Sequence, residues 1–328
     1  MTKALETPFP TFSVVTEWEN VKLSDFDRAR RMLKALATQL AELRPQFAAR
    51  PEVIFLHDRE AIDLEAVKAA VAEAFTDPDV AKLTFVATDG ADYYQQKNIG
   101  VSLVDTELVV FLDSDVIPEP GWLAGLLTTF RDPSYDVVGG TTFLDLNRFS
   151  SRAFALFWFF PLEQGREGLR ESRHFFANNV AFRREVIAQN PFPKLPSLRG
   201  ACSILAQELM AKGHKIFINE SSRVCHPPPN GVRHVLYRAM CQGHDDLVLG
   251  NLREPHKFRS AFSNALWRFQ KRVRRAAKRI VLHRKEVGLG LVGTAGAAVL
   301  AVNYFLFYLV GLAISVVDRD YVPRRFPV

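Results

Sequence analysis

The sequence VVFLDSDVIPEPGW, residues 109–122, joins a continuous apolar run to two carboxylates and a turn. The apolar run predicts a buried strand, because a strand that is covered on both faces shows no polar alternation. Asp113 and Asp115 follow this strand at once. Two carboxylates so close together repel each other unless a positive group lies beside them. The stretch therefore raises the question of which positive group that is.

Three further strands are expected before this one, at residues 12–16, 52–58 and 82–88, with helical patterns between them. This alternation indicates a mostly parallel α/β sheet. Ligands of such open sheets bind beyond the carboxyl ends of the strands. The acidic residues found at those ends are Glu17, Asp58, Asp89, Asp113 and Asp115. The sequence thus predicts a binding site at this edge of the sheet.

An Asp-X-Asp pair that faces such a site suits a hard divalent cation. Mg²⁺ or Mn²⁺ can bridge carboxylate and phosphate oxygens. A bound cation removes the repulsion and stabilises a diphosphate leaving group as its negative charge builds. Phosphatases of the haloacid dehalogenase type also have a strand that ends in Asp-X-Asp, but on an early strand. Three strands precede the motif here, which disfavours that alternative.

Charge is distributed unevenly along the chain. Residues 257–285 hold eleven Lys or Arg and no acidic residue, and the rest of the chain holds 31 basic and 36 acidic residues. Residues 287–317 contain no charge, and roughly 20 apolar residues suffice to cross a bilayer. A basic amphipathic helix next to an apolar segment favours anionic membrane lipids as the partner, rather than nucleic acid.

Several further motifs occur in a specific order. They are a first strand followed by an acidic residue and Asn20, a second strand that ends at Asp58, QQKNIGVSLVDTELVVFLDSDVIPEPGWL (95–123), DVVGG (136–140), ANNVAFRREV (177–186), LAQELMAKGHKIF (205–217) and VCH (224–226). In this order they resemble family-2 glycosyltransferases of the GT-A fold, of the membrane-anchored bacterial type. The resemblance covers roughly residues 12–250.

The resemblance implies a GT-A catalytic domain at residues 1–250, with a Rossmann-like, mostly parallel mixed sheet. We expect a basic amphipathic interfacial helix at 251–286, a transmembrane segment at 287–317 and a short tail at 318–328. The excess of cations before the apolar segment places residues 1–286 in the cytoplasm, at the inner (plasma) membrane. Three arginines in or beside the tail weaken this assignment.

The resemblance also implies roles for individual residues. Donor binding is expected from Asp58 at the nucleotide base, from Lys97 and Asn98 near the nucleotide, and from Asp113 and Ser114 at the ribose or diphosphate. The metal ligands are expected to be Asp115, Asp113 and His226, although a structural histidine is the alternative for His226. The sugar and acceptor side is assigned to Asn178, Asn179 and Arg199. Glu17 replaces a proline of the usual pattern, and it is interpreted either as a nucleotide contact or as a local structural substitution.

One residue of the family pattern is missing. The usual Glu-Asp pair, which contains the general base, falls on Ala201 and Cys202, and no acidic residue occurs between Glu185 and Glu208. Three explanations stay open. The acceptor can be anionic already, such as a polyprenyl phosphate, and then needs no base. Another acid, with Glu208 as a weak candidate, can supply the base, or the domain has no transfer activity.

The resemblance therefore implies a metal-dependent, inverting glycosyltransferase. It would move a sugar from a UDP- or GDP-linked donor to a lipid-linked or saccharide acceptor, with Mg²⁺ or Mn²⁺ as cofactor. The alternative is a catalytically inactive membrane protein that keeps the fold for binding or assembly.

Overall fold

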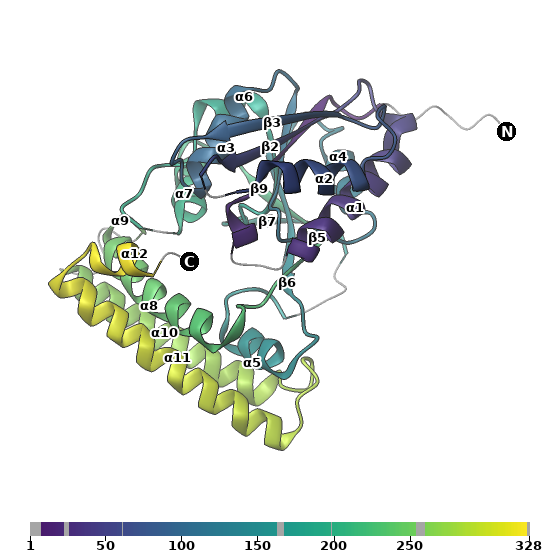
Figure 1. Cartoon of the computed structure of the whole chain (residues 1–328). Coiled ribbons are helices and arrows are strands. Elements are labelled where there is room, and N and C mark those ends of the chain that lie inside the picture. The colour runs from purple at the N-terminus through teal and green to yellow at the C-terminus, as the bar shows by residue number, and fades with distance from the viewer. Residues whose placement is uncertain are drawn as a thin grey trace. The chain divides into compact units, whose positions relative to one another are not determined.

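A computed structural model describes residues 8–22, 26–60, 62–162, 167–197, 199–253 and 260–326 of the 328-residue chain (Figure 1). The chain divides into two compact units, each built from several ranges. The first unit comprises Met1–Thr142, Gly165–Lys194 and Leu205–His226, and the second comprises Phe143–Gln164, Leu195–Ile204 and Pro227–Val328. The sequence instead predicts consecutive domains along the chain, and those domain boundaries remain a prediction.

The first unit is built on a mixed sheet, which has nine strands among the described residues. One half is parallel, in the order β3 (Lys82–Thr88), β2 (Glu52–Asp58), β1 (Phe12–Glu17) and β4 (Leu108–Leu112). The order continues through β8 (Asn179–Arg183), β6 (Val137–Leu144), β9 (Ile216–His226) and β5 (Ile117–Pro118), and β7 (Leu169–Ser172) pairs with β9. The pairs of β8 with β4 and β6, and of β9 with β5 and β7, are antiparallel. The predicted mixed sheet is thus confirmed, with its parallel part in the first four strands.

The described part of the first unit also contains several helices. They are α1 (Phe26–Leu43), α2 (Leu64–Ala74), α3 (Tyr93–Ser102), α4 (Trp122–Thr129) and α6 (Arg184–Gln189), with short 3-10 helices η1 (Glu19–Lys22) and η2 (Arg44–Gln46). Met32, Leu36 and Leu40 of α1 recur at helical spacing and are fully buried. Asp92 caps α3, because its carboxylate accepts the backbone N–H groups of Tyr94 and Gln95. The helix α7 (Ala201–Ala211) contains residues of both units.

The strand β4 positions the two aspartates. All five of its residues are buried, and it lies between β1 and β8. Because β1 and β4 are parallel, Glu17 and Asp113 emerge from the same edge of the sheet. Glu17 and Asp113 are therefore two members of the predicted group of acidic residues at the strand ends.

The second unit is helical in its described part. Its helices are α5 (Phe149–Phe157), α8 (Gly231–Val248), α9 (Gly250–Arg253), α10 (Ala261–Leu282), α11 (Leu291–Val317) and α12 (Tyr321–Arg325). The helices α8 and α10 run along α11 (Figure 1). Close contact requires glycine at Gly243 and Gly311, because a Cβ atom at either position would lie 2.2 Å from a backbone oxygen of the facing helix. Within the described residues, α11 is the one helix that is long and apolar enough to cross a membrane.

Candidate active site

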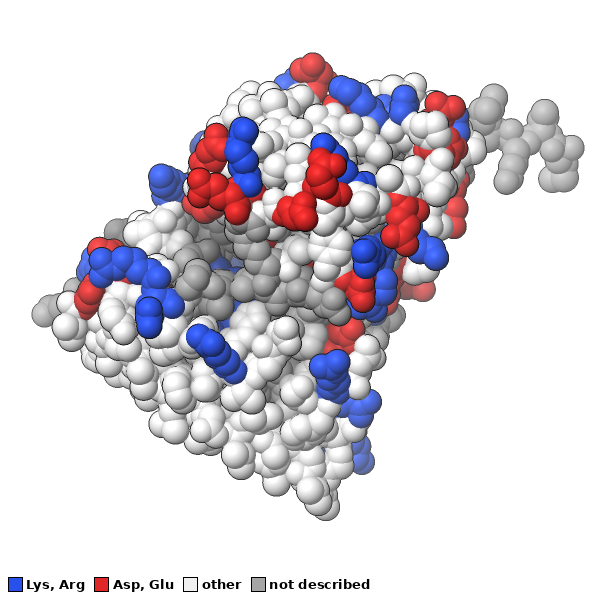
Figure 2. Space-filling model, in the orientation of Figure 1, with Lys and Arg blue, Asp and Glu red and all other residues white. Residues whose placement is uncertain are grey.

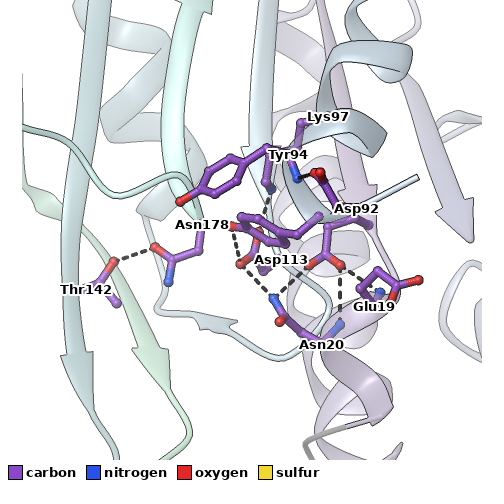
Figure 3. Close-up of polar contacts among 10 residues, drawn as sticks. Glu19, Asn20, Asp92, Tyr94, Lys97, Asp113, Thr142 and Asn178 are labelled. Carbon is purple, nitrogen blue, oxygen red and sulfur yellow. Dashed lines mark hydrogen bonds and ion pairs between the residues drawn. The ribbon is translucent and has the colours of Figure 1, made fainter. Parts of the chain in front are cut away.

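Asp113 follows β4, and hydrogen-bond donors surround its carboxylate (Figure 3). The ammonium of Lys97, from α3, lies 2.6 Å from Oδ1. The Tyr93 hydroxyl contacts the two oxygens at 3.0 and 2.8 Å, and the Asn20 amide donates to Oδ2 at 3.1 Å. The positive group beside Asp113 in this structure is therefore a lysine of the chain.

Lys97 lies among aromatic rings and is excluded from solvent. Its side chain is 0% exposed and that of Asp113 is 3% exposed. The ammonium lies 4.6 Å from the ring centre of Tyr93 and 5.2 Å from that of Phe111. Burial, and then the negative charge of Asp113, raise the pKa of Tyr93 well above its ordinary value. Tyr93 therefore keeps its proton and acts as a donor to Asp113.

Glu17 ends β1 and accepts several hydrogen bonds from the turn that follows it. Its Oε2 accepts the backbone N–H of Glu19 at 2.7 Å and that of Asn20 at 3.3 Å, and its Oε1 accepts the Asn20 amide at 2.8 Å. Burial raises the pKa of Glu17 well above its ordinary value, and the charge of Asp113 raises it further. Asn20 thus links Glu17 to Asp113. These bonds support the structural interpretation of Glu17, and its contact with a nucleotide stays a prediction.

Arg28 of α1 connects the Asp-X-Asp turn to the end of β9. Its Nε donates to the backbone carbonyl of Asp115 at 2.6 Å, and one Nη donates to that of Cys225 at 2.6 Å. Arg28 is buried, and Cys225 directly precedes His226. The guanidinium therefore ties the backbone of Asp115 to that of Cys225, the residue before His226, and so links the segments that carry these two predicted metal ligands. Arg28 was not predicted from the sequence, although a basic residue among the buried positions of α1 could have indicated it.

Asn178 and Asn179 have different surroundings. Asn179 is fully buried; its Oδ1 accepts from Trp122 at 2.7 Å, and its Nδ2 donates to the backbone of Ser222 at 3.1 Å. Asn178 Oδ1 accepts the hydroxyl of Thr142 at 3.0 Å, and its side chain lies across the site from Asp113 (Figure 3). Asn179 is thus a structural link between strands, and the acceptor roles of both residues remain predictions.

Three further residues predicted on the donor side, Asn98, Asp58 and Ser114, have different surroundings. Asn98 exchanges two hydrogen bonds with the backbone of Phe192, at 2.8 and 2.9 Å. Asp58 accepts the backbone N–H of Glu60 at 2.9 Å, which closes the turn after β2. Ser114 is fully buried, and its hydroxyl has no hydrogen-bond partner within the described residues. These contacts give Asn98 and Asp58 structural functions, and their contacts with a nucleotide remain predictions.

The comparisons with known proteins agree with this geometry. Residues 27–190, half of the chain, match the family model described as glycosyl transferase family 2. The chain belongs to this family. The expectation of a family-2 glycosyltransferase is therefore confirmed. A comparison with curated proteins gave no match.

Two solved structures show the fold of this family-2 glycosyltransferase. The mannosyltransferase PcManGT from Pyrobaculum calidifontis, in complex with GDP-Man and Mn²⁺, is 16% identical with a TM-score of 0.58, and the match covers 96% of this chain and 90% of that one. TarS 1–349 from S. aureus, in complex with UDP-GlcNAc, is 13% identical with a TM-score of 0.51, and the match covers 92% of this chain and 90% of that one. At such identities the likeness concerns the fold, and it confirms the expected GT-A architecture.

The side chains of the glycosyltransferase allow a test of the predicted metal set. Both oxygens of Asp113 already accept from the donors described above, which disfavours Asp113 as a direct ligand. Within the described ranges, no group of three His, Cys, Asp or Glu side chains could hold a metal ion. Mg²⁺ sites commonly use one or two carboxylates, with substrate phosphates completing the coordination. Asp115 fits such a site, in which the substrate supplies the other oxygen ligands.

The residues near the missing acid belong to different parts of the chain. Arg199, Ala201 and Cys202 lie in the second unit, and Glu208 lies in the first. Ala201 is buried and Cys202 is a thiol outside any disulfide. Glu208 is exposed on α7. The identity of a general base, including Glu208, therefore stays a prediction.

Proposed function

We propose that this glycosyltransferase transfers a sugar from a nucleoside diphosphate sugar to a lipid-linked or saccharide acceptor. The observation that carries the proposal is the pair Asp113 and Asp115, nearly buried at the carboxyl end of β4, where open α/β sheets bind ligands. The GDP-Man and UDP-GlcNAc bound to the two similar structures support a nucleotide-sugar donor.

The two aspartates have different roles in binding the donor. Lys97, Tyr93 and Asn20 hold Asp113 in one orientation, so that its carboxylate forms a rigid wall of the site. Asp115 provides the carboxylate for Mg²⁺ or Mn²⁺. When bound, such a cation stabilises the charge that develops on the leaving diphosphate. Arg28 fixes the backbone of Asp115 and so positions this ligand.

The acceptor half requires a nucleophile that can attack without the usual acid at positions 201 and 202. A lipid phosphate fits this requirement, because its oxygen is ionised at neutral pH and needs no general base. We therefore favour a polyprenyl-phosphate-type acceptor at the cytoplasmic face of the plasma membrane. Transfer would invert the anomeric centre, through a single displacement by the phosphate oxygen. The apolar helix α11 supports attachment to a membrane.

A transfer assay with Asp115→Asn tests the proposal. The full chain is incubated with UDP- and GDP-linked sugars, with a polyprenyl phosphate or a saccharide acceptor, and with or without Mn²⁺. Asp115→Asn should reduce turnover by at least about a hundredfold, because it removes the charge of the ligand. Asp105→Asn, at an exposed position of the same unit, is the matched control. Equal donor binding and turnover in both variants would remove the metal site from the proposal.

The missing acid also supports the second candidate, a protein that binds nucleotide sugars without transferring them. In that case the chain binds a nucleotide sugar but releases no nucleotide with any acceptor. Donor binding measured by calorimetry, alongside nucleotide release, separates the two candidates.

A further inference from the structure

Helix α11 has two faces of different character along its whole length. One face is buried against the rest of the second unit and includes Ala297, Ala301, Tyr304, Tyr308, Leu312 and Ser315. The other face is exposed and, apart from Asn303, whose side-chain amide donates to the backbone of Val299, it is apolar. Its residues recur every three or four positions. It includes Val292, Val299, Val302, Leu306, Val310 and Val317, with exposed fractions from 45% to 90%. A lone membrane-crossing helix would instead present all of its faces to lipid.

The buried face of α11 is covered by a helix with polar side chains. Tyr308 donates to Asp246 of α8 at 2.9 Å, and His244 of α8 lies 3.0 Å from the Ser315 hydroxyl. The backbones of α8 and α11 approach closely at Gly243 and Gly311. The helix α8 therefore has to share the environment of α11.

Helix α10 lies against the middle of α11 and carries exposed cations. The Phe269 ring is 5.9 Å from that of Phe305 and 5.4 Å from that of Tyr308. Arg272 donates to both oxygens of Asp246, at 2.7 and 3.1 Å. The exposed cations of α10 are Lys271, Arg274, Arg275 and Lys278. At 1.5 Å per residue, they lie within about 9 Å of Arg272 along the helix axis.

These positions are incompatible with a simple crossing. The 27 residues of α11 span about 40 Å, and its middle would lie at the centre of a hydrocarbon layer of about 30 Å. The cations of α10 would then be at the same depth. Each Lys or Arg at that depth disfavours insertion by about a hundredfold or more. In addition, cations flank α11 at both ends, with Lys285 before it and Arg319 and Arg324 after it.

The geometry points to attachment in the plane of the membrane: the exposed face of α11 lies in the acyl chains of one leaflet, and the cations of α10 and of the flanks of α11 bind anionic headgroups. Figure 2 shows the surface formed by α11 without charged side chains, with Lys and Arg side chains at its margins and with acidic side chains beside them at the end near α12. This pattern is typical of helices that lie in the interface. The inference replaces a crossing by α11 with an in-plane attachment. It deepens the membrane attachment within the proposed function, and its tests do not use sugar transfer.

A labelling experiment distinguishes in-plane attachment from crossing. Glu286→Cys and Asp320→Cys place exposed thiols before and after α11. The full chain is produced in a bacterial host. A membrane-impermeant maleimide is then added either to spheroplasts, which are cells without their outer layers, or to inverted membrane vesicles. We expect both thiols to react only in the inverted vesicles, with the chain without added cysteines as the background control. Labelling of Asp320→Cys in the spheroplasts would overturn the inference.

A binding experiment tests the lipid chemistry. Flotation of the purified chain is compared on phosphatidylcholine vesicles with and without phosphatidylglycerol. Lys271→Gln combined with Lys278→Gln should weaken binding to the anionic vesicles about 25-fold, from roughly a fivefold loss for each cation. Lys34→Gln combined with Arg31→Gln, at exposed positions of α1, is the matched control and should have no effect.

The apolar face is tested separately. Val302→Asp and Leu306→Asp should each weaken vesicle binding by roughly tenfold or more, whereas Val232→Asp, at an exposed position of α8, should not. Unchanged circular dichroism shows that each variant is folded. Unchanged flotation of folded Val302→Asp would overturn the inference. The inference would also be overturned if the chain forms a dimer without lipid and Val302→Asp dissociates that dimer. A second copy of the chain would then cover the exposed face of α11.

Discussion

The ion pair of Lys97 with Asp113 makes a sharp prediction about stability. Lys97→Met removes the ammonium and keeps most of the side-chain volume. Asp113 then remains nearly buried with a negative charge and without its cation. Removing one partner of a buried ion pair costs about 3–5 kcal/mol. We expect the lower end of this range, about 3 kcal/mol, because Tyr93 and Asn20 still donate to the carboxylate.

The double variant Lys97→Met with Asp113→Asn separates the charge from the packing. It leaves no buried charge at this pair, so most of the lost stability should return. The thermodynamic cycle over the two positions then gives a coupling free energy of about 2 kcal/mol or more.

Urea unfolding of the full chain, followed by tryptophan fluorescence, measures these differences. Trp18 and Trp122 are fully buried in the first unit and report on its unfolding. Lys34→Met, at an exposed position of α1, should change stability by no more than about 0.5 kcal/mol. A loss below about 1 kcal/mol for Lys97→Met, or additive effects in the double variant, would refute the assignment of Lys97 as the cation that stabilises Asp113.

The remaining predictions concern four other residues. The pKa of Glu17 is raised on folding, so its ionisation opposes folding once the pH exceeds the ordinary value of 4.5. Glu17→Gln should therefore gain stability relative to the native chain as the pH rises from about 5 to about 8 in urea titrations; a constant difference would contradict this. Arg28→Lys should lower donor affinity in calorimetry about tenfold, because a single ammonium cannot reproduce the two-sided contact of a guanidinium; native affinity would show that this link is dispensable. Gly140→Ala places a Cβ atom 1.9 Å from the backbone oxygen of Ser222 and should cost more than about 3 kcal/mol in urea unfolding. Gly121→Ala, which meets no atom but has a φ of 82°, should cost about 1 kcal/mol.

The sequence alone predicted the elements on which the site is built. The strands expected at residues 52–58 and 82–88 are β2 and β3, and the apolar run before Asp113 is β4. These predictions succeeded because short apolar runs and helical period-3.6 patterns depend on neighbours in the chain. The position of the two aspartates beyond a buried strand followed from the same local pattern.

The partners of those aspartates could not be predicted in this way. The sequence interpretation placed a metal ion between Asp113 and Asp115, and this ion remains a prediction. The structure adds two partners, Lys97 at Asp113 and Arg28 at the backbone of Asp115. Arg28 is 87 positions from Asp115 in the sequence. Such contacts depend on how helices pack on the sheet, and no local period reports them. Asn98 and Asn179 show the same limit, because both were assigned to ligands and both bind the backbone of distant segments.

Helix α11 shows most clearly the difference between what the sequence determines and what the tertiary structure decides. The sequence by itself determined that residues 291–317 form a long, uncharged helix that prefers an apolar environment, because hydropathy is a sum over the residues themselves. Only the tertiary structure decided that one face of this helix is covered by α8 and α10 and the other is exposed. That distinction arises from packing between helices, which brings Asp246 and Arg272 beside Tyr308 and ties the apolar helix to charged neighbours.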